Sequence, residues 1–256
     1  LTGKTGSMVS DGDFLWIGSN DGVFANIRYD GSNSYQENIR PNSPAAKSVF
    51  KLHHDGKRLF VGPGGISDVY APIFNNDGYY QLEDYFWTNY PNSEFNNYQD
   101  MVAFIVDPED PKHFYASYYG NGIVEFKDNT YTQLISSLLF PGKFPGINGG
   151  NEHRVGGFSA DEDNNIWFTN SRTDKPLCVI RPGGDVECFS LGSVVPSNAE
   201  IKSILYTTQN QVWIQMRGGG VAVVNVVDEN TFDPKRLSSS EGSGNLPSER
   251  VLSFAE

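Results

Sequence analysis

Short apolar segments recur along this chain, and turns rich in Gly, Asp or Asn separate them. The same order occurs five times: a polar turn, an apolar strand with an aromatic residue, a second turn rich in Gly or Asn, and another apolar strand. An amphipathic helix of ordinary length would need an apolar residue every three or four positions over a longer stretch. The pattern therefore predicts an all-β protein built from a repeated unit.

The aromatic residue of each copy gives the length of the repeat. These residues lie 44 to 55 positions apart, and they are Trp16, Phe60, Tyr115, Trp167 and Trp213. A four-stranded blade of a β-propeller has about 40–50 residues. We therefore predict a β-propeller of four-stranded blades, with five repeats visible.

Flanking segments supply the remaining strands of the blades. Apolar stretches ahead of four aromatic anchors predict innermost strands, and these are KSVFKL, DMVAFIV, RVGGFSA and IKSILY. Stretches downstream suit outer strands, namely GYYQLE, TYTQLI and DVECFSL.

The two ends of the chain complement each other. The first copy lacks a clear innermost strand, and residues 246–256, LPSERVLSFAE, look like an innermost strand with nothing after it. We expect the N- and C-terminal strands to pair and close the ring, within a single propeller domain of residues 1–256. We also expect this domain to be a fragment of a longer protein. The alternative is an arc of a larger ring.

The repeat resembles the two-component regulator propeller family. The stretches that carry the resemblance are DGDFLWIGSNDGVF, FSADEDNNIWFTN and LPSERVLSFAE. The longer stretch DPEDPKHFYASYYGNGIVEFKD is similar to the propeller of the PorZ family, surface proteins of the type IX secretion system of Bacteroidetes. Phe60 and Tyr115 stand where the repeat usually has Trp, and residues 207–211 replace its usual Asp/Gly turn.

The resemblance implies a function in binding. It implies an exported, non-enzymatic scaffold, at the cell surface and outer membrane or in the periplasm, that binds anionic lipopolysaccharide or glycan and other secretion-system proteins. One alternative is a periplasmic propeller that senses glycans for a hybrid two-component system. A second alternative is a propeller lyase or glycosidase. The repeat motif carries no catalytic residues, and we expect no cofactor.

The net charge excludes two classes of partner. The chain carries a formal charge of −12, which disfavours nucleic acid and a general attraction to anionic membrane, because both need clustered Lys and Arg. No run of residues approaches the roughly 18 apolar positions of a membrane span.

Cys178 and Cys188 are the two cysteines of the chain, in the stretch LCVIRPGGDVECF. A hairpin loop of three or five residues centred on Gly183 would place them opposite each other, where a disulfide typical of an oxidising compartment could form. A two-residue loop would shift the register and leave two reduced thiols. Both interpretations remain open at this point.

Cations and aromatic residues recur where the loops of one propeller mouth are expected. Loops entering the innermost strands offer Lys47, Arg154 and Arg250, and loops between second and third strands offer Tyr118, Tyr119, Arg172 and Arg217. Guanidinium groups bind phosphate or carboxylate, and aromatic faces stack on sugar rings, so this set predicts a site for an anionic sugar. The alternative is that these cations are solvated or pair with Glu152, Glu200 and Glu249.

Other candidate sites are weaker. Asp161, Asp163 and Asn165 have the spacing of a calcium loop, but Ile166 and Arg172 replace its expected Gly and Glu, so we interpret the stretch as a turn. The four His residues show no spacing typical of metal ligands, and no metal site is predicted. The aromatic stretch YFWTNYPNSEFNNY, from Tyr85, is expected to be a loop that either recognises a partner or packs under the blades.

Overall fold

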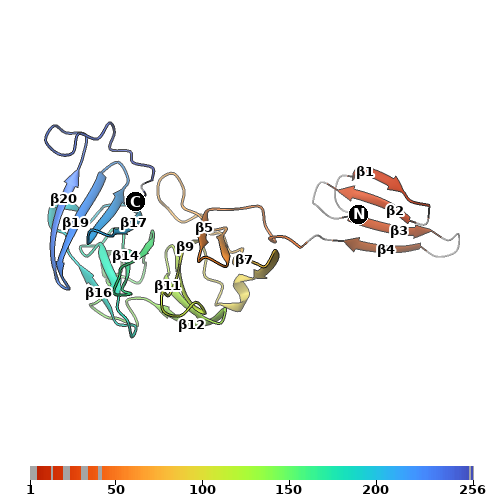
Figure 1. Cartoon of the computed structure of the whole chain (residues 1–256), viewed down its shortest axis with the longest axis horizontal. Coiled ribbons are helices and arrows are strands. Elements are labelled where there is room, and N and C mark those ends of the chain that lie inside the picture. The colour runs from red at the N-terminus through yellow and green to blue at the C-terminus, as the bar shows by residue number, and fades with distance from the viewer. Residues whose placement is uncertain are drawn as a thin grey trace. The chain divides into compact units, whose positions relative to one another are not determined.

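The protein is built from β-sheets. The structure, a computed structural model, describes residues 5–12, 14–19, 24–29, 34–39, 42–253 and 255. These residues form five four-stranded antiparallel sheets, and in each sheet the strands follow one another in chain order (Figure 1). Each sequence repeat therefore builds one sheet, which confirms the all-β, propeller-like fold.

The strands have the following bounds. The first sheet contains β1 (Thr5–Ser10), β2 (Phe14–Ser19), β3 (Phe24–Tyr29) and β4 (Ser34–Ile39). The second contains β5 (Lys51–His54), β6 (Leu59–Gly62), β7 (Tyr79–Glu83) and β8 (Phe86–Tyr90). The third contains β9 (Met101–Val106), β10 (His113–Tyr118), β11 (Gly122–Lys127) and β12 (Thr130–Ile135). The fourth contains β13 (Phe158–Ala160), β14 (Ile166–Thr169), β15 (Leu177–Ile180) and β16 (Val186–Phe189). The fifth contains β17 (Ile201–Thr207), β18 (Gln211–Met216), β19 (Gly220–Asp228) and β20 (Thr231–Leu237).

Helical structure in the described part of the chain is limited to short 3-10 turns, at Asn92–Glu94, Ile147–Gly149 and Gly192–Val194. Among the described residues there is no helix with the length and apolar character needed to span a membrane.

The five aromatic anchors all lie in the second strand of their sheet, as predicted. A polar side chain near the preceding turn holds each tryptophan indole. The Nε1 of Trp16 donates to Asp11 at 2.9 Å, that of Trp167 to Asp161 at 2.7 Å, and that of Trp213 to Gln211 at 3.2 Å. The polar turn and the aromatic residue of the repeat therefore work as one structural unit.

The chain divides into two compact units, residues 1–44 and 45–256. The first unit holds the first sheet. The absence of an innermost strand in this copy is a wrong prediction, because β1 pairs with β2 throughout its length. The described part of residues 246–256 contains no strand, and residues 254 and 256 lie outside the described residues. Closure of a ring by the two ends stays a prediction.

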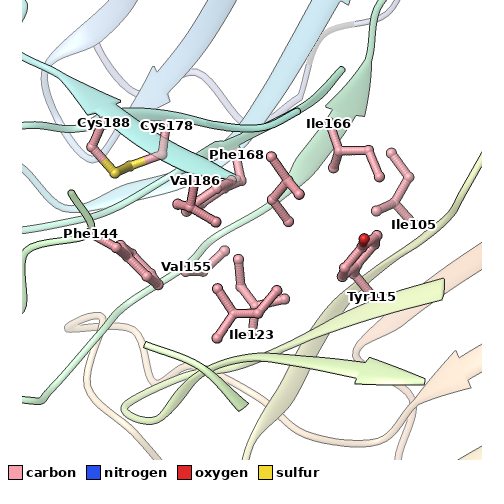
Figure 2. Close-up of a cluster of buried hydrophobic side chains, with 12 residues drawn as sticks. Ile105, Tyr115, Ile123, Phe144, Val155, Ile166, Phe168, Cys178, Val186 and Cys188 are labelled. Carbon is pink, nitrogen blue, oxygen red and sulfur yellow. A yellow bond between two sulfur atoms is a disulfide. The ribbon is translucent and has the colours of Figure 1, made fainter. Parts of the chain in front are cut away.

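The second unit holds the other four sheets, side by side. Strand β9 contacts β5 and β13, and β17 contacts β13 and β14, so the first strands of successive sheets are neighbours. Alternate residues of each strand face opposite sheets. Ile166 and Phe168 pack toward the third sheet, in a cluster with Tyr115 and Ile123 (Figure 2). Trp167, between them in sequence, packs toward the fifth sheet. The cores therefore lie between the sheets.

The second sheet corrects two strand assignments. GYYQLE is the third strand, β7, and the outer strand is β8, within the aromatic stretch expected to be a loop. Asp84 and Tyr85 form the connecting turn with positive φ angles of 49° and 63°. Such a turn usually contains Asn or Gly, and because Asp84 and Tyr85 stand here instead, the sequence pattern did not indicate a hairpin. Tyr85 and Phe86 are exposed, whereas Phe95 packs in the core of this region.

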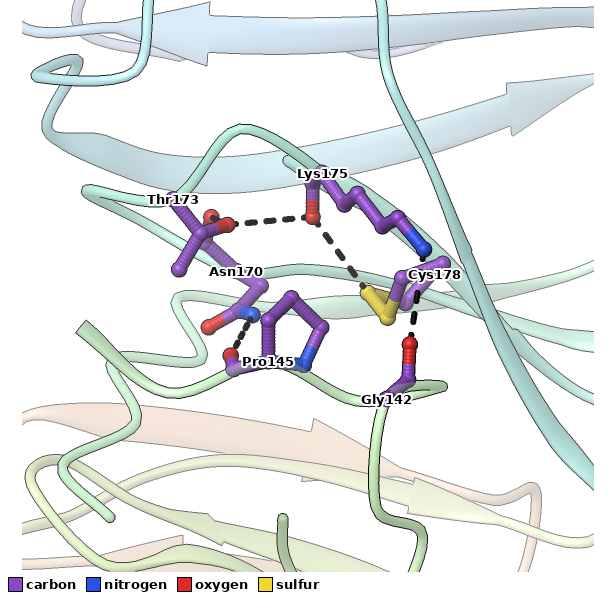
Figure 3. The surroundings of a disulfide bond; sticks show 7 residues. Gly142, Pro145, Asn170, Thr173, Lys175 and Cys178 are labelled. Carbon is purple, nitrogen blue, oxygen red and sulfur yellow. Dashed lines mark hydrogen bonds between the residues drawn. A yellow bond between two sulfur atoms is a disulfide. The ribbon is translucent and has the colours of Figure 1, made fainter. Parts of the chain in front are cut away.

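Cys178 and Cys188 form a disulfide between β15 and β16. Ile180 pairs with Val186, so the hairpin loop has five residues centred on Gly183 and the cysteines face each other. Around the bond, the side chain of Asn170 donates to the carbonyl of Pro145 at 2.8 Å (Figure 3). The disulfide thus reinforces the hairpin of the fourth sheet on the side where that sheet meets the third.

Candidate functional site

The loops at one end of the four sheets in residues 45–256 are joined by a repeated pattern of backbone hydrogen bonds. We call this end the mouth; its loops between second and third strands are residues 63–78, 119–121, 170–176 and 217–219. In each of the last three sheets, one loop residue donates to the segment entering its own first strand, and a later one donates to the next such segment. The donor and acceptor pairs are Tyr119 to Asp100, Gly120 to His153, Ser171 to Arg154, Arg172 to Ala199, Arg217 to Glu200 and Gly220 to Glu249.

The last of these pairs locates the C-terminal segment. Glu249 accepts from Gly220 as His153 accepts from Gly120, so the chain beside Arg250 takes the place of a segment that enters a further first strand. This agrees with the position predicted for Arg250 from the sequence.

The longest mouth loop reaches the other sheets. We call residues 63–78 the strap. Its Val69 carbonyl accepts a hydrogen bond from Arg217 Nη1 at 3.4 Å, and its Tyr70 carbonyl accepts from Arg154 Nη1 at 3.0 Å and from the Tyr119 hydroxyl at 3.3 Å. The strap of the second sheet therefore contacts the third, fourth and fifth sheets at the mouth.

Asp100 anchors the base of the strap. Its carboxylate accepts the backbone N–H groups of Ile73, Phe74 and Asn75 at 2.8–3.0 Å. Its own backbone N–H donates to the carbonyl of Asn75 at 2.7 Å. Asp100 is almost fully buried, and these hydrogen bonds replace the water that a buried carboxylate loses.

Arg154 is a buried structural residue. It is 9% exposed, and its guanidinium binds Glu152 at 2.7 Å and Glu200 at 3.3 Å as well as the strap. It also lies 5.5 Å from the centre of the Tyr119 ring. The predicted alternative of pairing with Glu152 and Glu200 is thus what the structure contains for this arginine, and its donors are directed within the protein.

Glu200 is the shared acceptor of the mouth. Its carboxylate lies 3.3 Å from Arg154, 3.8 Å from Arg172 and 3.3 Å from the Tyr119 hydroxyl. Burial raises the pKa of Glu200, and the neighbouring arginines oppose that shift. Burial likewise raises the pKa of Tyr119.

A cavity of about 650 Å³ lies beside the strap, between the second and fifth sheets. Three cations, Lys202, Arg217 and Arg250, and one carboxylate, Asp68, line it. Lys202 and Arg250 are exposed and form no ion pair within the described residues. The guanidinium of Arg217 lies 5.4 Å from the centre of the Tyr70 ring, which also lines the cavity. Burial raises the pKa of the Tyr70 hydroxyl.

The predicted site residues are thus divided among different roles. Arg217 and Arg250 line the cavity, Arg154 and Tyr119 hold the strap, and Arg172 lies beside Glu200. Tyr118 is a core residue that is 1% exposed, and its ring packs against those of Phe95 and Tyr98. Its position in the strand directs the side chain into the hydrophobic cluster between the second and third sheets. Lys47 is exposed and makes none of the described contacts at the mouth.

Two residues of the cavity were missed by sequence reasoning. Lys202 lies at the second position of β17, two residues after Glu200. Side chains two residues apart in a strand point to the same face, and this spacing could have indicated that Lys202 lies at the mouth. Tyr70 carries no such signal, because the strap brings it to the fifth sheet through long-range contacts.

The calcium-like stretch is a turn. Oδ1 of Asp161 accepts the backbone N–H groups of Asp163 and Asn165, and Oδ2 accepts from the side chains of Asn165 and Trp167, all at 2.7–3.0 Å. These four hydrogen bonds engage both carboxylate oxygens, so the role of Asp161 is to stabilise the turn.

Comparison with known proteins places the fold. No family model and no curated protein matches the chain. PorZ, an essential bacterial surface component of the type IX secretion system of Porphyromonas gingivalis, is similar over 88% of this chain and 31% of its own, with a TM-score of 0.66 and 19% identity. The extracellular domain of a protein named as a hybrid two-component system from Bacteroides thetaiotaomicron is similar over 96% and 30%, with a TM-score of 0.54 and 14% identity.

A third neighbour is named as a 6-phosphogluconolactonase from Bacteroides uniformis. It is similar over 88% of this chain and 68% of its own, with a TM-score of 0.50 and 11% identity. The chain therefore spans less than a third of PorZ and of the sensor domain. At these identities the similarities show a shared fold. PorZ and the sensor domain are neighbours that the repeat resemblance predicted, and the lactonase is not.

Proposed function

We propose that this chain is a non-catalytic binding propeller of an exported protein, at the cell surface or in the periplasm, and that its mouth binds an anionic glycan such as lipopolysaccharide. The observation that carries the proposal is the cavity beside the strap, where three cations meet an aromatic ring in a protein of net charge −12. Cations that are not internally paired retain their capacity to bind phosphate or carboxylate. The similarity to PorZ supports a role as a type IX secretion component that also contacts other secretion-system proteins.

Calorimetric titration with anionic lipopolysaccharide, at low and at high salt, tests the proposal. We expect saturable binding that weakens with salt, because charged groups are screened. The double variant Lys202→Ala/Arg250→Ala removes two cations that make no internal ion pair, and it should weaken binding by roughly tenfold or more.

The matched control is Lys112→Ala/Lys235→Ala. It removes the same charge from exposed side chains outside the cavity, each of which pairs only with a nearby surface Asp. If both double variants weaken binding equally, the attraction is general and the mouth is not the site. If the wild type does not bind at either salt concentration, the proposal fails.

A second candidate is a sensor of glycan fragments, and the similarity to the extracellular sensor domain favours it. Binding of oligosaccharide fragments with no binding of intact lipopolysaccharide would select this candidate. The gene that encodes the full-length protein would then also encode a membrane helix and a kinase.

A further inference from the structure

A second cavity lies at the end of the sheets opposite the mouth, between the third and fourth sheets. Its volume is about 450 Å³. Turns between first and second strands and between third and fourth strands border it, and in antiparallel sheets these turns lie at the end away from the loops of the mouth. This cavity is therefore separate from the proposed anion site.

The floor of this cavity carries a compensated set of charges. His113 Nδ1 lies 2.8 Å from Asp107 Oδ2, and its Nε2 lies 2.7 Å from Glu125 Oε1. Lys127 lies 4.0 Å from the same Glu125 oxygen. The hydrogen bonds to Glu125 and Asp107 raise the pKa of His113, so the imidazolium offsets the carboxylates. Neither a free anion nor a free cation meets a strong net charge here.

One polar group in the cavity lacks a partner. Tyr115 is 4% exposed and lines the cavity, and its hydroxyl makes no hydrogen bond to any described residue. Burial raises the pKa of that hydroxyl, and the carboxylates of Glu125 and Asp107, which line the same cavity, add to the increase. A tyrosine hydroxyl that has no partner within the protein can donate a hydrogen bond to a ligand group that reaches it.

A hydroxyl group matches this arrangement best. It can accept a hydrogen bond from Tyr115 and at the same time donate to a carboxylate oxygen of Glu125 or Asp107. A ligand carboxylate can only accept hydrogen bonds, so it cannot donate to the carboxylates of Glu125 and Asp107. Ile135 of the third sheet and Ile166 and Ile180 of the fourth border the cavity as an isoleucine wall, which C–H groups can contact.

We propose that this cavity binds a neutral sugar, with the Tyr115 hydroxyl and the carboxylates contacting its hydroxyl groups and the isoleucine wall contacting its apolar face. The volume accommodates a monosaccharide or a disaccharide, being within the usual range for small-ligand sites. Figure 2 shows the Tyr115 ring and Ile166 in the packed interface between the third and fourth sheets, and both residues also line the cavity.

The test is binding of neutral sugars to the whole chain, measured by ligand-observed NMR and titration calorimetry. The probes are methyl glycosides of glucose, galactose, mannose, xylose and N-acetylglucosamine, together with maltose and cellobiose. We expect at least one probe to bind saturably and without dependence on salt. Tyr115→Phe removes only the hydroxyl and should weaken that binding roughly three- to tenfold, as expected for one hydrogen bond.

Tyr118→Phe is the matched control. It removes a buried tyrosine hydroxyl that has no hydrogen-bond partner among the described residues, in the same strand but away from the cavity, and it should leave sugar binding unchanged. The proposal is overturned if no probe binds, if Tyr115→Phe binds as the wild type does, or if both variants lose binding equally. Binding of lipopolysaccharide at the mouth should be unaffected by Tyr115→Phe, so the two proposals can fail separately.

Discussion

Two buried histidines show how neighbours set the charge of a side chain. His113 lies between two carboxylates, which raise its pKa, with Glu125 making the larger contribution. His153 is fully buried, its ring centre lies 4.2 Å from that of Phe144, and burial lowers its pKa to about 4. At pH 7 His153 is therefore neutral, and its Nε2 accepts the backbone N–H of Ser137 at 3.0 Å.

We predict that protonation of His153 destabilises the protein in acid. The unfolded chain binds this proton with a pKa near 6.5 and the folded chain with a pKa near 4, so the unfolded state binds more protons between these values. The free energy of unfolding should fall by about 2–3 kcal/mol from this residue between pH 7 and pH 4.5. Urea unfolding at both pH values measures it. His153→Gln should lose less stability over that interval, and an equal loss would contradict the assignment.

The pKa shift of His113 has the opposite direction, so its contribution to stability depends on pH in the opposite way. Its folded-state pKa is raised above 6.5, so its stabilising contribution is complete below pH 6.5 and is lost as the pH rises through the folded value. His113→Gln should cost about 2 kcal/mol of unfolding free energy at pH 6, as expected for charged hydrogen bonds, and clearly less at pH 9. Urea unfolding of both proteins at the two pH values measures this difference. A cost that does not change with pH would show that His113 is neutral in the folded protein.

At the scale of elements, sequence periodicity was sufficient for the second strand of each sheet and insufficient for the strap. Alternation and aromatic spacing located the second strand of every sheet, because burial between two sheets imposes a period of two. The strap has no such period. Its conformation depends on Asp100, which lies 25 or more residues later in the chain, and on positive φ angles at Tyr70 and Phe74, residues that rarely adopt them.

The same limit explains which mouth residues were assigned correctly. The positions of Arg154, Arg217 and Arg250 at the mouth follow from the repeat, since equivalent loops meet at one end of the sheets. Their roles do not follow from it, because the strap determines which arginine is enclosed and which remains beside the cavity. The inward direction of Tyr118 was readable from its alternation with Ala116, which is also buried.

We predict that Asp100→Ala releases the strap. The variant loses a partly buried acceptor for three backbone N–H groups, which should lower the free energy of unfolding by about 2 kcal/mol or more. Limited proteolysis should then cut near Phe74, whose side chain is 68% exposed, well before the rest of the protein is degraded. Asp68→Ala, which alters an exposed strap residue that is not an anchor, is the control. Equal cleavage of the two variants would show that Asp100 does not hold the strap.

At the scale of the whole molecule, the three hydrophobic clusters all draw their residues from 45–256. Each cluster lies between two successive sheets of that unit, and the strap, its anchor and the disulfide belong to the same unit. The predicted ring of five blades assigns the first repeat a closing role. The three clusters nevertheless lie within the four sheets of residues 45–256.

We therefore predict that residues 45–256 fold without residues 1–44. The isolated segment should unfold in one cooperative transition, because it contains three hydrophobic clusters that link its four sheets. A reducing agent should lower its stability by about 2–3 kcal/mol, as expected for opening a disulfide that closes a short loop. Calorimetry and urea unfolding of the segment and of the whole chain, each with and without reductant, measure both effects. Loss of the cooperative transition on removing residues 1–44 would contradict this prediction and would support a ring that the first repeat completes.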